Sequence, residues 1–432
     1  MIQRPKGTSD ILPETVANWH FVEDTARDIL DRYRFFEIRT PMFESYDLFS
    51  RGVGETTDVV TKEMYDFFDK GDRHIALKPE GTAPIVRAYI ENKLYGPEFQ
   101  KPYKVYYMGP MFRYERPQGG RQRQFHQLGV EVFGGNDAWT DVETIAMAND
   151  IFQAVGITDL KLVINSLGDT DCRLRYREAL IDYLTPFEDQ LSEDSRRRLH
   201  ENPLRVLDSK DEKDKQFVAD APSILDYLSD ESKARFEQVK RDLEALNIDY
   251  VIDPNMVRGL DYYQETIFEM MTEDPVFGAE TTVCGGGNYT GLVQELSDDK
   301  VDVSGFGFAI GMERLLLLMA ARNVQVPAYN TLNVFIVTIG EKAQEAALPL
   351  MQQLRHQGFT VDQDVFGRKP KKQYKEADKR EAELALTVGE SELEAGKLTI
   401  KNLKTGHQEA FPVNEFRDNF AEIYRTMLVE GE

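Results

Sequence analysis

Residues 104–134 contain two strand-like runs joined by a flexible loop, and this pattern limits the possible folds of the chain more than any other. The runs KVYYMGPMFRYE and RQFHQLGVEVFG are rich in aromatic and β-branched residues, which favour strands. Four arginines surround the loop: Arg113, Arg116, Arg121 and Arg123. Because arginine presents a rigid fork of donors that matches phosphate oxygens, the pattern predicts a hairpin that binds a nucleotide or a nucleic-acid end. The alternative is a solvated hairpin with basic decoration.

The length and the composition set broad limits on the class of protein. A chain of 432 residues can form two or three domains with a large core, so it needs no disulfide bonds. The two cysteines lie far apart, and the histidines lack metal-binding spacing, which argues against a structural zinc site. The first residues have no apolar signal core, and no run of 18 apolar residues occurs. We therefore expect a soluble cytoplasmic protein that does not enter a membrane.

The charge is distributed unevenly along the chain. A net charge of −23 disfavours general binding to a polyanion. Two segments oppose this sign: the hairpin loop, and residues 368–380, with seven basic and two acidic residues. This distribution predicts contact with one defined nucleic acid and not the coating of DNA, although the second segment alone also suits a solvated helix.

Hydrophobic periodicity divides the chain into segments. Apolar residues recur at helical spacing over 14–35 and a helix is expected over 137–156, with strands between them and after them. Over residues 169–245 charged residues dominate and strand patterns disappear, which predicts a helical insertion. The last hundred residues alternate strand and helix, which predicts a small α/β domain with a largely parallel sheet. We place the domains at 1–325 and 326–432.

Four further segments combine residues that could carry chemistry. They are KPEGTAPIVR (78–87), MVRGLDYYQETIFE (256–269), VCGGGNYTGL (283–292) and GFGFAIGMERLLLL (305–318). Each of these segments, taken alone, also fits a structural role. Thr82 could cap a helix, and the glycines could allow two stretches of backbone to pack closely. Glu131 lies on a strand whose neighbours alternate in polarity. If it points inward, this carboxylate needs a partner, and an imidazole N–H would suit.

Together these strings resemble the class II aminoacyl-tRNA synthetases. The arginine-rich hairpin resembles motif 2 of that class, residues 305–318 resemble motif 3, and the helix and strand before Pro41 resemble motif 1. The string RGLDYY at 258–263 is most similar to histidyl-tRNA synthetases. The resemblance implies an α+β fold: a catalytic domain with an antiparallel sheet and a helical insertion, followed by a C-terminal α/β anticodon-binding domain.

The resemblance also implies an activity. Histidine and ATP would form histidyl-adenylate, and the histidyl group would then pass to the 3′ end of tRNA(His) in protein synthesis. We expect a cytoplasmic homodimer, a histidine–tRNA ligase that binds histidine, ATP with Mg²⁺ and tRNA, without a structural metal, a membrane or DNA as a partner. The basic segment 368–380 would meet the RNA backbone, and loop side chains would read unstacked bases.

The resemblance assigns roles to individual residues. Histidine would contact Glu80, Thr82, Gln127, Glu131, Tyr262, Tyr263 and Tyr289. Arg113 would hold the α-phosphate, Glu115 the adenine amino group and Arg314 the γ-phosphate. Arg258 and Arg113 would be catalytic, with Arg258 acting where other class II enzymes use a metal ion. Gln118 and Arg123 would contact the acceptor end of the tRNA.

Some positions depart from the family pattern. Asn288 and Thr290 replace an arginine and an aspartate, and Gly119 and Gln122 differ from the lysine and aromatic residue expected there. Two rival functions follow: a non-catalytic regulator of ATP phosphoribosyltransferase, and a signalling domain that binds uncharged tRNA. The regulator typically lacks the anticodon domain and loses the ATP-binding arginines, whereas the second would need an attached kinase domain. The retained arginines and C-terminal domain favour the ligase.

Overall fold

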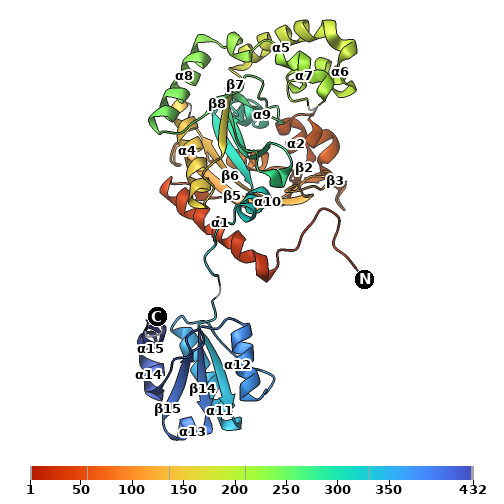
Figure 1. Ribbon diagram of the computed structural model, residues 1–432. Coiled ribbons are helices and arrows are strands. Elements are labelled where there is room, and N and C mark those ends of the chain that lie inside the picture. Colours follow the sequence, from red (N-terminus) through yellow and green to blue (C-terminus); the bar gives the residue numbers. More distant parts are fainter. Residues whose placement is uncertain (1, 56, 136, 210, 330, 430–432) are drawn as a thin grey trace. The chain divides into compact units, whose positions relative to one another are not determined.

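The computed structural model describes residues 2–55, 57–135, 137–209, 211–329 and 331–429 (Figure 1). The chain forms two compact units, Met1–Val326 and Pro327–Glu432. Each unit has its own buried apolar core.

An eight-stranded sheet forms the centre of the first unit, in the order β1-β5-β6-β11-β10-β9-β7-β8. Its strands are β1 (Phe36–Glu37), β5 (Tyr103–Phe112), β6 (Gln124–Phe133), β7 (Lys161–Ser166), β8 (Val251–Ile252), β9 (Gln264–Thr272), β10 (Thr281–Asn288) and β11 (Gly305–Gly311). The pairings from β5 to β7 are antiparallel, and the two edge pairs are parallel. The expected hairpin is β5–β6, and the expected antiparallel sheet is confirmed.

Side chains alternate between the two faces of this sheet. On β6, Leu128, Val130 and Val132 pack into a core with the helices α1 (Pro13–Arg32), α4 (Ala138–Ala154), α8 (Asp230–Ala245) and α10 (Met312–Ala321). The intervening residues, Glu131 among them, therefore face the opposite side. There Glu131 is opposite Gly307 of β11 in the antiparallel register. This second face carries the candidate site.

Helices dominate the chain between β7 and β8. They are α5 (Thr170–Leu184), α6 (Glu193–Glu201), α7 (Glu212–Ala219) and α8, with the 3₁₀ turns η2 (Thr185–Gln190), η3 (Pro203–Val206) and η4 (Ile224–Tyr227). The helix starts are marked by capping side chains: Asp169, Ser192, Asp211 and Ser229 each accept a backbone N–H from the first turn. In Figure 1, α5, α6 and α7 lie together at one end of the first unit. We call the segment 169–245 the insertion.

Smaller elements complete the first unit. A second sheet has the order β2-β4-β3, and its strands are β2 (Phe43–Ser45), β3 (Tyr65–Phe68) and β4 (His74–Leu77). The helical elements are α2 (Tyr46–Val53), the π-helix η1 (Val59–Glu63), α3 (Thr82–Glu91), η5 (Pro275–Phe277) and α9 (Leu292–Leu296). The segment that precedes α3 ends at one wall of the candidate site.

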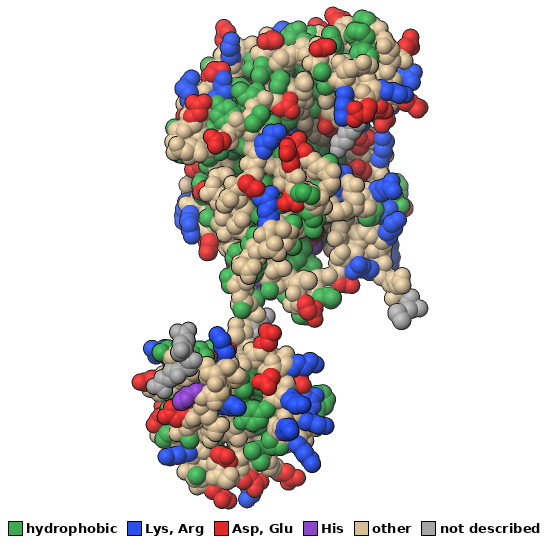
Figure 2. Space-filling view, viewed as in Figure 1, with side chains coloured by type: hydrophobic (Ala, Val, Ile, Leu, Met, Phe, Trp, Pro, Cys, Tyr) green, Lys and Arg blue, Asp and Glu red, His purple; other side chains and the backbone are tan. Residues whose placement is uncertain are grey.

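The second unit holds a five-stranded sheet in the order β13-β12-β14-β15-β16. Its elements are β12 (Val334–Ile339), α11 (Glu341–His356), β13 (Val361–Gln363), α12 (Pro370–Lys379), β14 (Leu384–Gly389), α13 (Glu390–Glu394), β15 (Lys397–Asn402), β16 (Gln408–Pro412), α14 (Val413–Asp418) and α15 (Phe420–Val429). Figure 2 shows Lys and Arg side chains gathered on the α12 side.

The largely parallel sheet expected for this unit is wrong for half of its pairings. Strands β13, β12 and β14 are parallel, but β15 pairs antiparallel with both of its neighbours. The reason lies in the connections, because a parallel crossover needs about a dozen residues or more. The connections that flank β15 are the short helix α13 and a tight turn.

Candidate functional site

A cavity of about 410 Å³ lies against the second face of the central sheet. Its walls include predicted site residues from widely separated segments: Glu80, Thr82, Arg113, Glu115, Gln127, Arg258, Tyr262, Tyr263, Tyr289 and Arg314. The fold thus brings together residues from five separate sequence strings, the hairpin and the four further segments. Glu131 lies directly behind this wall, 1% exposed.

Glycines on β10 and β11 make room for the polar side chains. A Cβ atom on Gly307 would lie 2.1 Å from Oε2 of Glu131, and one on Gly285 would lie 2.6 Å from the guanidinium of Arg258. A Cβ on Gly305 would overlap the ring of Tyr289 at 1.9 Å. We call Gly285, Gly305 and Gly307 the glycine floor. Side chains lie so close to the sheet backbone at these positions that only glycine fits. This explains the two glycine-rich strings.

Two hydroxyl groups donate to Glu131, and no cation among the described residues forms an ion pair with it. Thr82 Oγ1 donates to Oε1 at 2.7 Å, and the Tyr289 hydroxyl donates to Oε2 at 2.5 Å. Burial raises the pKa of Glu131 to about 8, although both hydroxyl groups act in the opposite direction. Glu131 is therefore an inward carboxylate, and the hydroxyl partners connect it to α3 and to the segment after β10.

Glu80 anchors the start of helix α3. Its carboxylate accepts the backbone N–H groups of Thr82 at 2.7 Å and Ala83 at 2.9 Å. Capping by the Thr82 side chain is wrong as an explanation of this string, because the N-cap is Gly81 and the Thr82 hydroxyl points to Glu131. Burial raises the pKa of Glu80, while the two backbone N–H groups act against that rise. Two carboxyl groups therefore lie in one enclosed region.

Arginines gather at the other side of the cavity. Arg113 Nε donates to the Pro79 carbonyl at 2.8 Å, and Arg314 Nη1 donates to the Thr282 carbonyl at 2.5 Å. Burial, together with the nearby cation of Arg121, lowers the pKa of Arg314 to about 10. Glu115 lies 3.5 Å from Arg121 and 3.9 Å from Arg113. This cluster provides positive charge for an anion such as a phosphate chain.

Arg258 forms an ion pair with Glu269, a residue that sequence reasoning missed. Glu269 lies on β9 and also accepts from Thr282 Oγ1 at 2.5 Å. The one available signal was a single charged residue in the apolar run TIFEMM. Arg258, Tyr262 and Tyr263 lie in the segment before β9, which begins at Gln264. The ring centroids of the two tyrosines are 4.7 Å apart.

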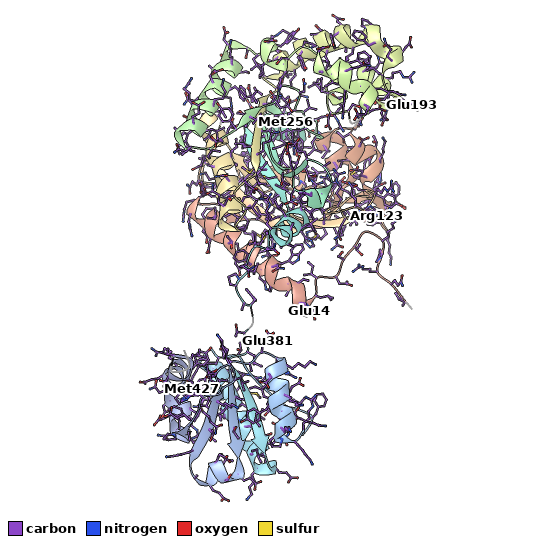
Figure 3. The ribbon with its side chains drawn as sticks, in the orientation of Figure 1. Glu14, Arg123, Glu193, Met256, Glu381 and Met427 are labelled. Carbon is purple, nitrogen blue, oxygen red and sulfur yellow. The ribbon has the colours of Figure 1, made fainter. Side chains whose placement is uncertain are left out.

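The predicted tRNA contacts occupy the hairpin loop. Gln118 and Arg121 exchange backbone hydrogen bonds, and Gln118 is exposed beside an adjoining cavity of about 760 Å³. Arg123, labelled in Figure 3, stacks on Tyr114 with 3.7 Å between its guanidinium carbon and the ring centroid. Its Nε donates to the Glu115 carbonyl at 3.2 Å, and its backbone N–H donates to the Gly7 carbonyl at 2.7 Å. Arg123 therefore orders this loop.

The two departures from the family pattern bond to each other. The side-chain oxygen of Asn288 accepts from the backbone N–H of Thr290 at 2.9 Å and from the Thr290 hydroxyl at 2.6 Å. A polar link without charge thus holds the turn that presents Tyr289.

Two negative observations apply to the described ranges alone. Within them, no cluster of three or more His, Cys, Asp or Glu side chains is arranged to hold a metal ion. Also within them, no helix combines the length and the apolar character needed to cross a membrane.

Comparison with known proteins identifies the family. The family model described as Histidyl-tRNA synthetase matches residues 7–315, and that described as Anticodon binding domain matches residues 333–423. The chain belongs to the histidyl-tRNA synthetase family. A histidine–tRNA ligase of Ligilactobacillus salivarius is 55% identical over 431 residues, covering 100% of this chain and 99% of its own. One of Streptococcus pyogenes is 56% identical over 427 residues, covering 99% of each chain.

A solved structure of a histidyl-tRNA synthetase supports the same assignment. The apo enzyme from S. aureus superimposes with a TM-score of 0.83 at 43% identity, covering 97% of this chain and 100% of its own. The expected class II catalytic fold and anticodon-binding domain are confirmed, and so is the expected function of histidine–tRNA ligase. Histidine, ATP and tRNA are the partners that this family implies. Full-length similarity to named ligases argues against the regulatory and signalling alternatives.

Proposed function

We propose that the cavity of about 410 Å³ is where histidine and ATP form histidyl-adenylate, which is then transferred to the 3′ end of tRNA(His). The observation that carries this proposal is one cavity with two different ends. The amino-acid end contains Glu80, Thr82, Gln127, Glu131, Tyr262, Tyr263 and Tyr289. The phosphate end contains Arg113, Glu115, Arg121 and Arg314. Arg258 also lines the cavity, and we assign it to both ends.

The amino-acid end suits a histidine zwitterion. Glu80 provides negative charge for the α-ammonium group, and Gln127 Oε1 is buried with no hydrogen-bond partner within the described chain. That oxygen is a free acceptor for an ammonium N–H. Glu131, with Thr82 and Tyr289, provides the polar contact for the imidazole ring. A buried polar group of this kind selects against amino acids that leave it unpaired.

The phosphate end suits ATP. We assign the α-phosphate to Arg113, the adenine amino group to Glu115 and the γ-phosphate side to Arg314. The histidine carboxylate attacks the α-phosphorus, pyrophosphate leaves, and Arg258 stabilises the charge that develops. Mg²⁺ would arrive with ATP, because the phosphate oxygens are the hard oxygen ligands that it prefers.

The remaining assignments concern the whole chain. We propose domains at 1–325 and 326–432, with the insertion at 169–245, in a cytoplasmic homodimer. Several exposed apolar residues support the dimer: Phe36 on β1, and Met42, Phe43, Phe67 and Phe68 on the second sheet or beside it. Gln118 and Arg123 would face the acceptor end of the tRNA, and α12 would meet the RNA backbone at the anticodon.

Histidine-dependent ATP–pyrophosphate exchange tests the proposed site. We expect exchange with histidine and not with other amino acids, and a fall of about 10³-fold or more in Arg258→Ala. Arg258→Lys, which keeps the charge but not the fork, should recover part of the rate. Unchanged exchange in a folded Arg258→Ala variant would overturn the assignment of this residue.

A further inference from the structure

The segment that carries Arg258, Tyr262 and Tyr263 is held from outside by the insertion. Residues 256–263 form neither helix nor strand, so their carbonyl groups lack the regular pairing of a sheet. Met256, labelled in Figure 3 where the insertion helices meet the central sheet, lies at its start. We call residues 256–263 the catalytic segment.

Arg173 of helix α5 binds the end of the catalytic segment. Its Nη1 donates to the carbonyl groups of Tyr263 at 2.9 Å and Asp261 at 3.3 Å, and its Nη2 donates to Asp261 at 3.3 Å. Burial lowers the pKa of Arg173, against the effect of the Asp261 carboxylate. A planar guanidinium that binds two carbonyl groups sets both position and orientation.

Asn202, which follows α6, binds the same segment through a side chain. Its Nδ2 donates to Oδ1 of Asp261 at 2.8 Å. The Asp261 backbone N–H donates to the Val53 carbonyl at 3.3 Å, and a Cβ on Gly54 would lie 2.6 Å from Oδ2. Asp261 is therefore enclosed between the insertion and the end of α2.

Arg205 of η3 binds the middle of the segment. Its Nη1 donates to the Gly259 carbonyl at 3.3 Å, and its Nη2 lies 3.5 Å from Asp58, which also pairs with Arg198 at 3.4 Å. Burial would raise the pKa of Asp58, but Lys62, Arg198 and Arg205 together lower it. The insertion thus binds the catalytic segment at its middle and at its end.

Apolar packing joins the same two regions. Tyr176 and Leu180 of the insertion belong to one buried cluster with Tyr262, Tyr263 and Tyr289 of the amino-acid end. The insertion and the amino-acid end of the cavity therefore share one apolar core.

We infer that Arg173, Asn202 and Arg205 are positioning residues for histidine activation, acting through the catalytic segment. The insertion would then contribute to the first half-reaction, in which no tRNA takes part. This inference rests on the proposed roles of Arg258, Tyr262 and Tyr263 and adds the device that holds them in place.

Exchange kinetics of the full-length chain, with histidine and ATP varied separately, tests the inference. In Arg173→Ala we expect kcat/KM for histidine to fall by about tenfold or more, and KM for ATP to stay within about twofold. The matched control is Arg177→Ala on the same helix, whose side chain bonds the His200 carbonyl inside the insertion. An effect of Arg173→Ala no larger than that of Arg177→Ala would overturn the inference.

A double-mutant cycle keeps the test decisive if Arg173→Ala fails to fold. Asn202→Ala and Asp261→Ala should each lower kcat/KM for histidine by about fivefold. The double variant should show about the same factor, because each substitution removes the same Asn202–Asp261 hydrogen bond. Effects that multiply to about 25-fold would count against the inference. Arg258→Ala serves as the separate test of the site: if it retains exchange, the site assignment fails, whatever the insertion variants do.

Discussion

The two ends of the cavity recognise their ligands by different physical means. At the amino-acid end, Glu131 is 1% and Glu80 is 3% exposed, and their partners are hydroxyl and backbone N–H groups. At the phosphate end, the side chains of Arg113 and Arg121 are 21% and 40% exposed. The enclosed end depends on satisfied hydrogen bonds and fixed shape, whereas the open end depends on charge, which solvent screens. Specificity for the amino acid should therefore be separable from affinity for the nucleotide.

Apart from Arg258→Ala, which affects both ends, the largest expected effect is at the phosphate end. Arg113→Ala removes a cation whose Nε is anchored on the Pro79 carbonyl. We expect exchange to fall by about 10²- to 10³-fold, because stabilisation of developing phosphate charge is lost. KM for histidine, measured in the same assay, should stay within about twofold. If KM for histidine rose as steeply, the two ends would not be independent.

The next effect is at the glycine floor. Gly307→Ala places a Cβ 2.1 Å from Glu131 Oε2 and 2.3 Å from the Val130 carbonyl oxygen. Because Val130 belongs to a paired strand, its backbone can move away only at a large cost in free energy. We expect a loss of about 1–3 kcal/mol in the free energy of unfolding, with weaker histidine binding. Gly109→Ala is the control, because a Cβ there has no heavy atom within 4 Å in the described structure. Denaturant titration measures the free energy of unfolding of both variants. Equal values for Gly307→Ala and Gly109→Ala would show that a Cβ at Gly307 is not crowded.

A third prediction concerns pH. Burial raises the pKa of Glu131 from its ordinary value of 4.5 to about 8 in the folded chain. Its contribution to stability is therefore complete below pH 4.5 and is lost as pH rises towards 8. Glu131→Gln keeps the shape and cannot ionise. Relative to this variant, the parent should lose up to about 1.4 kcal/mol per pH unit between pH 5 and 8. Parallel stability curves for the two proteins would show that Glu131 ionises without cost.

The smallest effect should come from Thr290→Ala. The substitution removes the hydroxyl that donates to Asn288 at 2.6 Å, but the backbone N–H bond to the same oxygen remains. We expect a loss of about 0.5–1 kcal/mol in the free energy of unfolding and exchange within about twofold of the parent. Thermal unfolding together with exchange kinetics measures both. A large loss of exchange would mean that the turn, through Tyr289, determines the amino-acid end.

Local patterns predicted the elements, but not all of their neighbours. Period-2 alternation in β6 predicted that Glu131 lies on one face of its strand, whereas the residues at the two ends of the cavity were predicted from the resemblance to the family motifs. Glu131 and Gly307 are far apart in the sequence but lie opposite each other on neighbouring strands. No local sequence pattern predicts such a pairing. Glu269 was missed because one carboxylate in an apolar strand is also typical of a solvent-facing position. The sheet of the second unit was misjudged because connection length, and not residue type, sets the direction of β15.

The glycine floor has a consequence for inhibitors that occupy the cavity. Every substitution of a glycine adds atoms, so mutation at Gly285, Gly305 or Gly307 can narrow this region and cannot widen it. A compound that reaches the floor would meet resistance only where the added atoms also displace Glu131, Arg258 or Tyr289. Escape from such a compound by mutation at these three positions would therefore also disturb the side chains that the site itself uses.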